Sequence, residues 1–412
     1  MGFREPSLHQ FISLVVMFFS FFIIFAFIAK SLPFLGNGFS DGGGGNSSVS
    51  MDALAPVMTL PSEIRATDIS SIKAFAESAK ISAIPSTYIS LKEPHHAEVA
   101  DELSAQIPVI DLSLLLSDDP QLHAQAVQDL ARACEEWGFF MVINHGIPES
   151  LMDEVMSLTE KFHNMSVEEK AEFADKGVST PIRCGTSFNP KAENVHYWRD
   201  YLKVITHPGW AFPHKPEGFN DVAKEYCRVT KNVARKLLEG ISESLGLEAN
   251  AIAKATDFDT GLQVFIANLY PPCPQPELAL GMPPHSDHGL LALLIQNGVG
   301  GLQINHKGKW VNVNPLPKSI LVNTADQLEV ASNGRYKSIL HRAALNNKET
   351  RVSLLIANGP NLENVVAPIP ELLEKEEAVF RAMRYKEYFE LQQKNKLDGK
   401  ACVDHIRINP TH

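Results

Sequence analysis

The stretch PPHSDHGLL, residues 283–291, places an aspartate two positions after a histidine. Residues i and i+2 of a strand point to the same face, so His285 and Asp287 can act together, whereas His288 points away. His341 follows in the β-rich run YKSILHRAAL. Two histidines and one carboxylate from neighbouring strands can occupy one face of an octahedral metal and leave three positions open, an arrangement suited to non-haem Fe(II). His285, Asp287 and His341 are therefore candidate metal ligands.

A second set of residues suits the binding of a dicarboxylate. Arg351 and Ser353 follow His341 in RVSLLIANGP, and Asn268 and Tyr270 have the same two-residue spacing in QVFIANLY. A guanidinium makes planar, charge-assisted hydrogen bonds to a carboxylate. Each feature alone is weak, because the chain has 15 histidines and a lone arginine is most often a surface charge. The H-x-D triplet becomes a stronger candidate metal site because His341, Arg351 and Ser353 follow it in the same β-rich half of the chain.

The second half of the chain has the pattern of short strands. Its runs are rich in β-branched and aliphatic residues and are separated by Gly, Pro and Asn-Gly: QVFIANLY, LLALLIQN, GLQINHKGKWVNVNP, SILVNTADQLEV, YKSILHRAAL and RVSLLIANGP. These runs predict an antiparallel sandwich or barrel. Earlier strands are predicted at IPVIDL and FFMVINHG, where Asn144-His145-Gly146 is interpreted as a turn.

The first half of the chain is mostly helical in its periodicity. Apolar residues recur at helical spacing in residues 121–139, in residues 150–165 and from about Phe219 to Leu247. A last helix is predicted from about Glu371 to Asn395. The expected architecture is a set of helices around a double-sheet β core.

The amino terminus is distinct from the rest of the 412-residue chain. Residues 11–29 are apolar apart from two serines, and a helix of that length is about enough to cross a ~30 Å hydrocarbon layer. The Gly/Ser-rich stretch LGNGFSDGGGGNSSVS follows, and the chain restarts at Met51. Two interpretations remain open: a single-pass anchor on a tether, or upstream sequence joined to a soluble protein that begins at Met51.

Charge and cysteine content exclude other classes. The net charge of −11 and dispersed basic residues argue against nucleic-acid binding. The five cysteines lie far apart without a C-x-x-C pair, so neither a disulfide framework nor a thiolate zinc site is indicated. A reducing compartment fits this composition best.

Long stretches of the chain resemble the plant soluble 2-oxoglutarate- and Fe(II)-dependent dioxygenases, the group of anthocyanidin synthase, flavanone 3-hydroxylase and the gibberellin oxidases. The matching stretches include NLYPPCPQPELALGMPPHSDHGLLALLIQNGVGGLQI, SNGRYKSILHR, ACEEWGFFMVINHGIP, PIRCGTSFNP, WRDYLKV and YKEYFELQQKNKLDGKACVDHIR. The resemblance covers about Ser71 to Ile408. Within the family, the chain is most similar to the branch of the downy-mildew-resistance-6-type enzymes.

The resemblance implies a mainly β fold with flanking helices and a double-stranded β-helix (jelly-roll) core, beside the candidate amino-terminal transmembrane helix. We divide the chain into an anchor candidate with linker (residues 1–50), an amino-terminal helical and β region (51–255), the jelly-roll core (256–362), and a carboxyl-terminal helix and tail (363–412).

The resemblance also implies a role for each candidate residue. The iron ligands are His285, Asp287 and His341. The residues that bind 2-oxoglutarate are Arg351 and Ser353 at its distal carboxylate, Tyr270 as a further donor, and Asn268 near the end that chelates iron. The chain departs from the family pattern at Leu269, which replaces a tyrosine, and at Ala325, which replaces a glycine. Neither position belongs to the metal ligands or the clamp.

The implied reaction is hydroxylation or desaturation of a small, largely apolar plant metabolite. Fe(II) is the cofactor, 2-oxoglutarate and O2 are cosubstrates, ascorbate is the expected reductant, and succinate and CO2 are co-products. We expect a monomer in the cytoplasm, or anchored in the endoplasmic reticulum through residues 11–29 with the catalytic region facing the cytosol. One alternative is a catalytically silent small-ligand-binding protein on the same fold. A zinc hydrolase is weaker still, because the chain has no H-E-x-x-H signature.

Overall fold

The computed structural model describes residues 69–78, 81–90, 99–177, 180–188, 193–394 and 399–408. The predicted anchor at residues 11–29 and the linker after it lie outside these ranges. No helix within the described ranges is long and apolar enough to cross a membrane.

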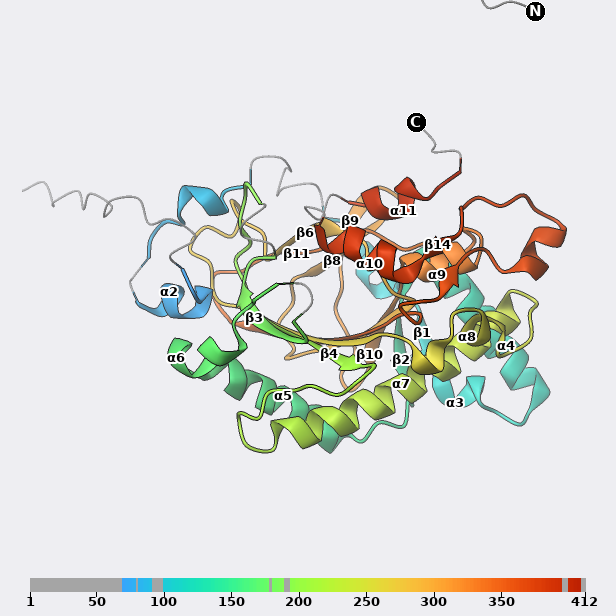
Figure 1. The fold of residues 1–412 in the computed structure, drawn as a ribbon, viewed down its shortest axis with the longest axis horizontal. Helices are drawn as coiled ribbons and strands as arrows, with labels where there is room; N and C mark the ends of the chain where they lie inside the picture. The colour runs from blue at the N-terminus through green and yellow to red at the C-terminus, as the bar shows by residue number, and fades with distance from the viewer. Residues whose placement is uncertain are drawn as a thin grey trace, which may run out of the picture. The chain divides into compact units, whose positions relative to one another are not determined.

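Two β-sheets form the centre of the fold (Figure 1). The major sheet has eight strands in the order β1-β2-β10-β7-β12-β5-β4-β3, and the minor sheet has four in the order β6-β11-β8-β9. The strands of the major sheet are β1 (Val109–Asp111), β2 (Phe139–Ile143), β3 (Ile182–Thr186), β4 (Asp200–His207), β5 (Gln263–Tyr270), β7 (Leu291–Gln296), β10 (Ile320–Thr324) and β12 (Arg351–Asn358). Those of the minor sheet are β6 (Met282–His285), β8 (Leu302–His306), β9 (Lys309–Asn312) and β11 (His341–Ala343). The predicted mainly β fold is confirmed.

Strand alternation gives the major sheet two different faces. On β5, Phe265 and Ala267 are buried in the main hydrophobic core, whereas Ile266 and Asn268 line a cavity. Strand β12 repeats this pattern, with Leu354 and Ile356 in the core and Arg351, Ser353 and Leu355 at the cavity. The side chains on β5 and β12 that are predicted to bind 2-oxoglutarate therefore share the face turned away from the apolar core.

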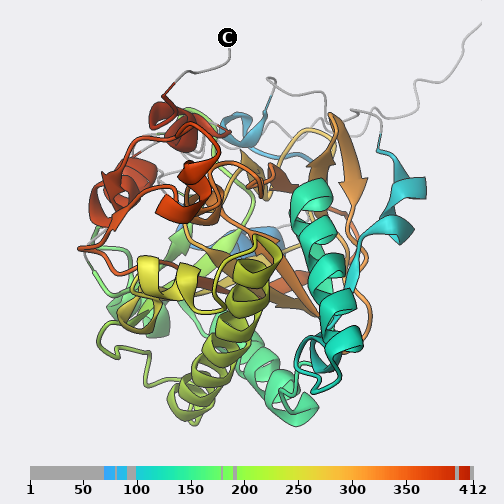
Figure 2. The same cartoon turned by 90° about the vertical axis from the view of Figure 1, so that its right-hand side faces the viewer.

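Three long helices cover the apolar face of the major sheet. They are α4 (Pro120–Arg132), α5 (Glu149–Asn164) and α7 (Phe219–Ser244), and α7 packs against both of the others (Figure 2). Helix α4 begins where the Asp119 side chain accepts hydrogen bonds from two backbone amides, with Pro120 in the first turn. The three helical predictions in the first half are confirmed.

The remaining α-helices are shorter. They are α2 (Ile72–Ser78), α3 (Leu112–Leu115), α6 (Val167–Lys170), α8 (Ala251–Ala255), α9 (Asp326–Ala331), α10 (Tyr385–Lys394) and α11 (Ala401–His405). Strands β13 (Val365–Val366) and β14 (Met383–Arg384) form a small separate sheet.

Two predicted elements were wrong in part. The run SILVNTADQLEV is a strand only to Thr324, and its second half forms the fully buried helix α9. The helix predicted from Glu371 to Asn395 is interrupted, and only α10 within it is a regular α-helix. The interruption has a tertiary cause, because the Asn333 side chain donates to the carbonyl of Glu377 and accepts from the amide of Val379. These bonds stabilise an irregular loop where helical turns were predicted.

Candidate active site

His285, Asp287 and His341 meet at one end of the minor sheet. His285 and His341 are directly paired residues of β6 and β11, and Nε2 of each lies 3.8 Å from Oδ1 of Asp287. One possible ligand atom from each of the three residues lies within 4.8 Å of the other two. The structure thus brings together all three predicted ligands, although β6 ends at His285 and Asp287 lies just beyond it.

The hydrogen bonds of the two histidines leave Nε2 of each available to a metal. Nδ1 of His285 lies 2.8 Å from the carbonyl oxygen of Pro283, and Nδ1 of His341 lies 3.2 Å from that of Ile339. A carbonyl oxygen accepts only from an N–H, so each Nδ1 carries the hydrogen and each Nε2 its lone pair. Backbone partners of this kind fix the orientation of metal-binding histidines.

The charge state of the cluster also suits a cation. Burial lowers the pKa of His285 to about 4, with a smaller contribution from the nearby His341. Burial acts to raise the pKa of Asp287, but His341, His285 and the Asn323 amide outweigh it and hold that pKa below its usual value. His285 is therefore neutral and Asp287 ionised near pH 7, as metal coordination requires.

Asp287 is held by groups outside the cluster. Asn323, on β10, donates from Nδ2 to Oδ2 of Asp287 at 2.9 Å, which leaves Oδ1 facing the histidines. The amide of Asp326, at the start of α9, donates to the Asp287 carbonyl at 2.8 Å, and the next amide donates to Gly289. The first amides of a helix lack partners within the helix, so here they fix the loop that carries the carboxylate. The sequence analysis did not identify Asn323. The signal that could have found it is a polar residue within an otherwise apolar strand.

His288 is turned away from the cluster. Its Nδ1 lies 2.7 Å from the Tyr385 hydroxyl, and its ring packs edge-on against Phe389 of α10. The Asn144–Gly146 stretch is an irregular segment with a bend at Asn144, in which Ile147 donates from its amide to Nδ1 of His145. Neither histidine belongs to the three-residue cluster.

Arg351 forms a buried cationic end to the same cavity. It pairs directly with Tyr270 across β12 and β5, and its guanidinium carbon lies 5.1 Å from the centre of the Tyr270 ring. Its Nη2 donates to the neutral Gln296 side chain, whereas its buried Nε has no hydrogen-bond partner among the described residues. Burial lowers the pKa of Arg351, which is 2% exposed. A buried arginine without a carboxylate fits the carboxylate of a bound ligand.

The other predicted residues surround this cation. Ser353 pairs with Asn268 two residues further along the same two strands, and all four residues line the cavity of about 130 Å³ that contains the metal cluster. Asn268 accepts at Oδ1 from Nη1 of Arg199 at 2.8 Å. Gly281 makes room for Tyr270, since a Cβ at Gly281 would lie 2.5 Å from its ring.

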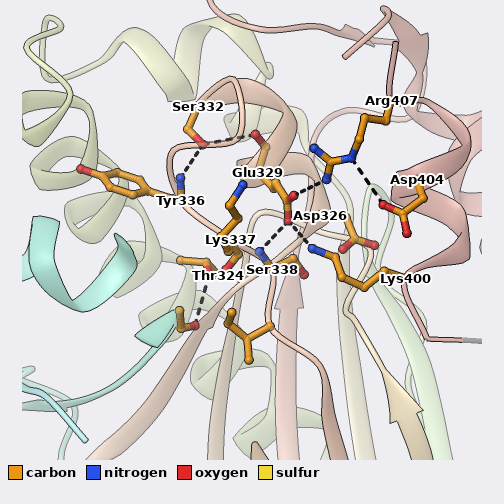
Figure 3. A network of polar contacts seen from close by, with 12 residues as sticks. Thr324, Asp326, Glu329, Ser332, Tyr336, Lys337, Ser338, Lys400, Asp404 and Arg407 are labelled. Carbon is orange, nitrogen blue, oxygen red and sulfur yellow. Dashed lines mark hydrogen bonds and ion pairs between the residues drawn. The ribbon is translucent and has the colours of Figure 1, made fainter. Parts of the chain in front are cut away.

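The carboxyl-terminal segment contributes to the wall of the cavity. Gln392 and Gln393 of α10 line the cavity, and Gly399 bridges to the backbone of His285. This segment is attached through Glu329 of α9, which is fully buried and accepts from Lys400 at 2.6 Å and from Arg407 at 2.9 Å. Figure 3 shows both cations converging on this carboxylate, which also accepts from the amide of Ser338. Sequence reasoning did not identify this attachment.

Comparison with known families and proteins agrees with this geometry. Residues 261–359 match the model of the 2OG-Fe(II) oxygenase superfamily, and residues 107–225 match that of the non-haem dioxygenase in morphine synthesis N-terminal domain. The rice protein 2-oxoglutarate-dependent dioxygenase 19 (Oryza sativa subsp. japonica) is 41% identical over 79% of this chain and 98% of its own length. The chain belongs to the 2OG-Fe(II) oxygenase superfamily.

Further similarities place this 2OG-Fe(II) oxygenase among plant enzymes. Protein DMR6-LIKE OXYGENASE 2 of Arabidopsis thaliana is 36% identical over 79% of the chain and 94% of its own length. The crystal structure of JOX2 in complex with 2OG, Fe and JA matches with a TM-score of 0.75 and 28% identity, over 83% of this chain and 98% of that one. The predicted dioxygenase family and its downy-mildew-resistance-6-like branch are confirmed.

Membership in this superfamily identifies the chain as an oxidoreductase that uses Fe(II) and 2-oxoglutarate. The hydrogen-bonded histidines and the unpaired Arg351 Nε fit these two groups. The alternatives of a silent binding protein and a zinc hydrolase receive no support from the comparisons.

Proposed function

We propose that His285, Asp287 and His341 hold the Fe(II) of a dioxygenase that hydroxylates, or desaturates, a small and largely apolar metabolite. The observation that carries the assignment is the convergence of two Nε2 atoms, each with its Nδ1 bound to a carbonyl, on one oxygen of Asp287. Iron bound there supplies the activation of O2, and the protein supplies the geometry.

The remaining predicted residues are proposed to bind 2-oxoglutarate. Arg351 and Ser353 bind its distal carboxylate, Tyr270 donates to it, and Asn268 lies toward the end that chelates iron. Their direct pairing across β5 and β12 supports this arrangement, because it places the clamp on two rigid strands. A small substrate fits the modest cavity, and the JOX2 structure likewise holds JA together with 2OG and Fe.

Metal binding and turnover in single-residue variants test the ligand assignment. We expect Asp287→Ala to lose both stoichiometric Fe(II) binding, measured by calorimetry under anaerobic conditions, and the formation of succinate from 2-oxoglutarate. His214→Ala is the control, because His214 is exposed and lies outside the cluster. An Asp287→Ala protein that binds one Fe(II) with unchanged affinity and forms succinate normally would remove Asp287 from the site.

The location of the enzyme is a separate proposal. We infer that the catalytic region faces the cytosol, where 2-oxoglutarate is available, whether or not residues 11–29 anchor it. Asn164 of the sequon Asn-Met-Ser is exposed at the end of α5, so a secretory route would permit its glycosylation. A glycosidase-sensitive change in mass that disappears in Asn164→Gln would contradict a cytosolic location.

A further inference from the structure

A second group of cations lines the cavity, away from Arg351. Arg183 on β3 and Lys203 on β4 are directly paired residues, and both border the cavity. Lys203 also pairs with Ile266 of β5, four positions before Tyr270. At a rise of roughly 3.3 Å per residue, that separation is about 13 Å along the strand. Arg183 and Lys203 therefore lie well away from the Arg351 end of the proposed 2-oxoglutarate clamp, although Asn268 is only two positions from Ile266 on β5.

A neutral amide stands between these two cations. Oε1 of Gln393 accepts from Nζ of Lys203 at 3.0 Å and lies 3.5 Å from Nη2 of Arg183. Asp175 approaches Arg183 only to 4.0 Å and also accepts from the Tyr201 hydroxyl. The described part of the chain provides Lys203 with hydrogen bonding and with the face of the Phe389 ring, whose centre lies 5.7 Å from Nζ, but with no ion pair. The positive charge of Lys203 is therefore unbalanced.

The surroundings of Lys203 disfavour its positive charge. Burial, followed by Arg183 and Arg199, lowers its pKa well below the usual value. Asp175 and then Asp287 act in the opposite direction, but Asp175 lies beside Arg183 and makes no ion pair with Lys203, and the charge of Asp287 is assigned to the iron. If Lys203 served only to hold α10 through Gln393, a neutral donor could make the same bond without the penalty of a partly buried charge. A cation at this position is favourable when an anion enters the cavity.

We propose that Lys203 and Arg183 bind the carboxylate of an organic-acid substrate, with Gln393 as a third polar contact. The proposal rests on the dioxygenase function and specifies its substrate class. Asp175 already offsets part of the charge on Arg183, and the neighbouring Arg199 is engaged by the Ser187 carbonyl and Asn268. Lys203 and Arg183 together therefore carry less than two unbalanced charges, which matches a monocarboxylate better than a phosphate dianion. Phe188, Ile266 and Leu355 also line the cavity and provide an apolar surface for the rest of the molecule.

Paired acids and amides test this inference directly. The probes are 3-phenylpropanoate, cinnamate and cyclohexylacetate, each compared with its primary amide by calorimetry on the anaerobic protein with Fe(II) and 2-oxoglutarate bound. The wild-type protein is expected to bind at least one acid tenfold or more tightly than its amide. Lys203→Gln should abolish this preference, and Lys224→Gln should keep it because Lys224 is exposed on α7.

Thermal unfolding without a probe separates ligand binding from a structural role. Removing an unbalanced, partly buried cation should leave the melting temperature of Lys203→Gln equal to or above that of the wild type. A lower melting temperature with an unchanged acid preference would make Lys203 a structural residue and overturn the proposal.

The binding experiment also distinguishes failure of this inference from failure of the proposed function. If the wild type binds 2-oxoglutarate but binds no acid more tightly than its amide, the carboxylate subsite is wrong and the dioxygenase assignment stands. If the wild type with Fe(II) does not bind 2-oxoglutarate, the proposed function itself is contradicted.

Discussion

Replacing Glu329 by glutamine should release the carboxyl-terminal segment from the rest of the fold. The Glu329 carboxylate is fully buried and accepts three hydrogen bonds, from Lys400, Arg407 and the amide of Ser338. Hydrogen bonds to charged groups contribute about 1.5–3 kcal/mol each. Glutamine keeps one acceptor oxygen but no charge. Lys400 and Arg407 retain side-chain exposures of 22% and 16%, so they can recover part of their hydration.

The attachment of the carboxyl-terminal segment should therefore lose about 3 kcal/mol of free energy in Glu329→Gln, near the lower end of the range for breaking a buried pair. Because about 1.4 kcal/mol corresponds to a factor of ten, the open state of the segment becomes roughly a hundredfold more populated. Hydrogen exchange measured by mass spectrometry reports this opening at the amides of α10 and α11. The amides of α7 should exchange at their wild-type rates, because α7 lies on the other side of the major sheet and is not attached through Glu329.

Glu376→Gln provides the matched control. Glu376 pairs with Arg335 at 2.8 Å, but both side chains are about 40% exposed, and pairs of this kind contribute less than about 1 kcal/mol. The reasoning is refuted if Glu329→Gln accelerates exchange in α11 less than threefold, or if Glu376→Gln accelerates it equally.

Two other predictions concern the cofactor clamp and the helical layer. Arg351→Lys keeps the positive charge but loses the planar fork, so the concentration of 2-oxoglutarate needed for half-maximal turnover should rise at least tenfold; an unchanged requirement would exclude Arg351 from the clamp. The Leu115 carbonyl and the Glu243 carboxylate raise the pKa of His123 above its ordinary 6.5, so the protonated folded form is favoured. This stabilisation is complete below pH 6.5 and disappears as the pH rises through the raised value. The melting temperatures of wild type and His123→Gln should differ more at pH 6 than at pH 9, and a difference independent of pH would contradict the pairing.

The sequence predicted the chemistry of the site better than its surroundings. His341 and Arg351 could be identified because each lies in a short β-rich run and because its residue type suits one ligand. Arg183, Lys203 and Gln393 come from segments far apart in the chain, and no local pattern shows that such residues meet. One signal was present in WRDYLKV, where residues 199, 201 and 203 alternate on one face of a strand and put two cations beside the cavity.

The errors in secondary structure have a common physical origin. Residues 326–331 were predicted to continue a strand, but they form a helix whose first amides bind the loop carrying Asp287. The loop before α10 is held by the side chain of Asn333. In both places tertiary hydrogen bonds decided the local conformation, and periodicity in a single sequence does not contain that information.

The attachment of the carboxyl terminus to Glu329 has a consequence for biosynthesis. Glu329 leaves the ribosome well before Lys400 and Arg407, by roughly 4–16 s at ordinary rates of translation. During that interval an unneutralised carboxylate opposes the burial of α9, the helix whose first amides fix the loop of Asp287. The final form of the metal site is therefore disfavoured in a nascent chain until residues 400–407 have been made, which limits the chance that a half-finished enzyme captures iron and activates oxygen.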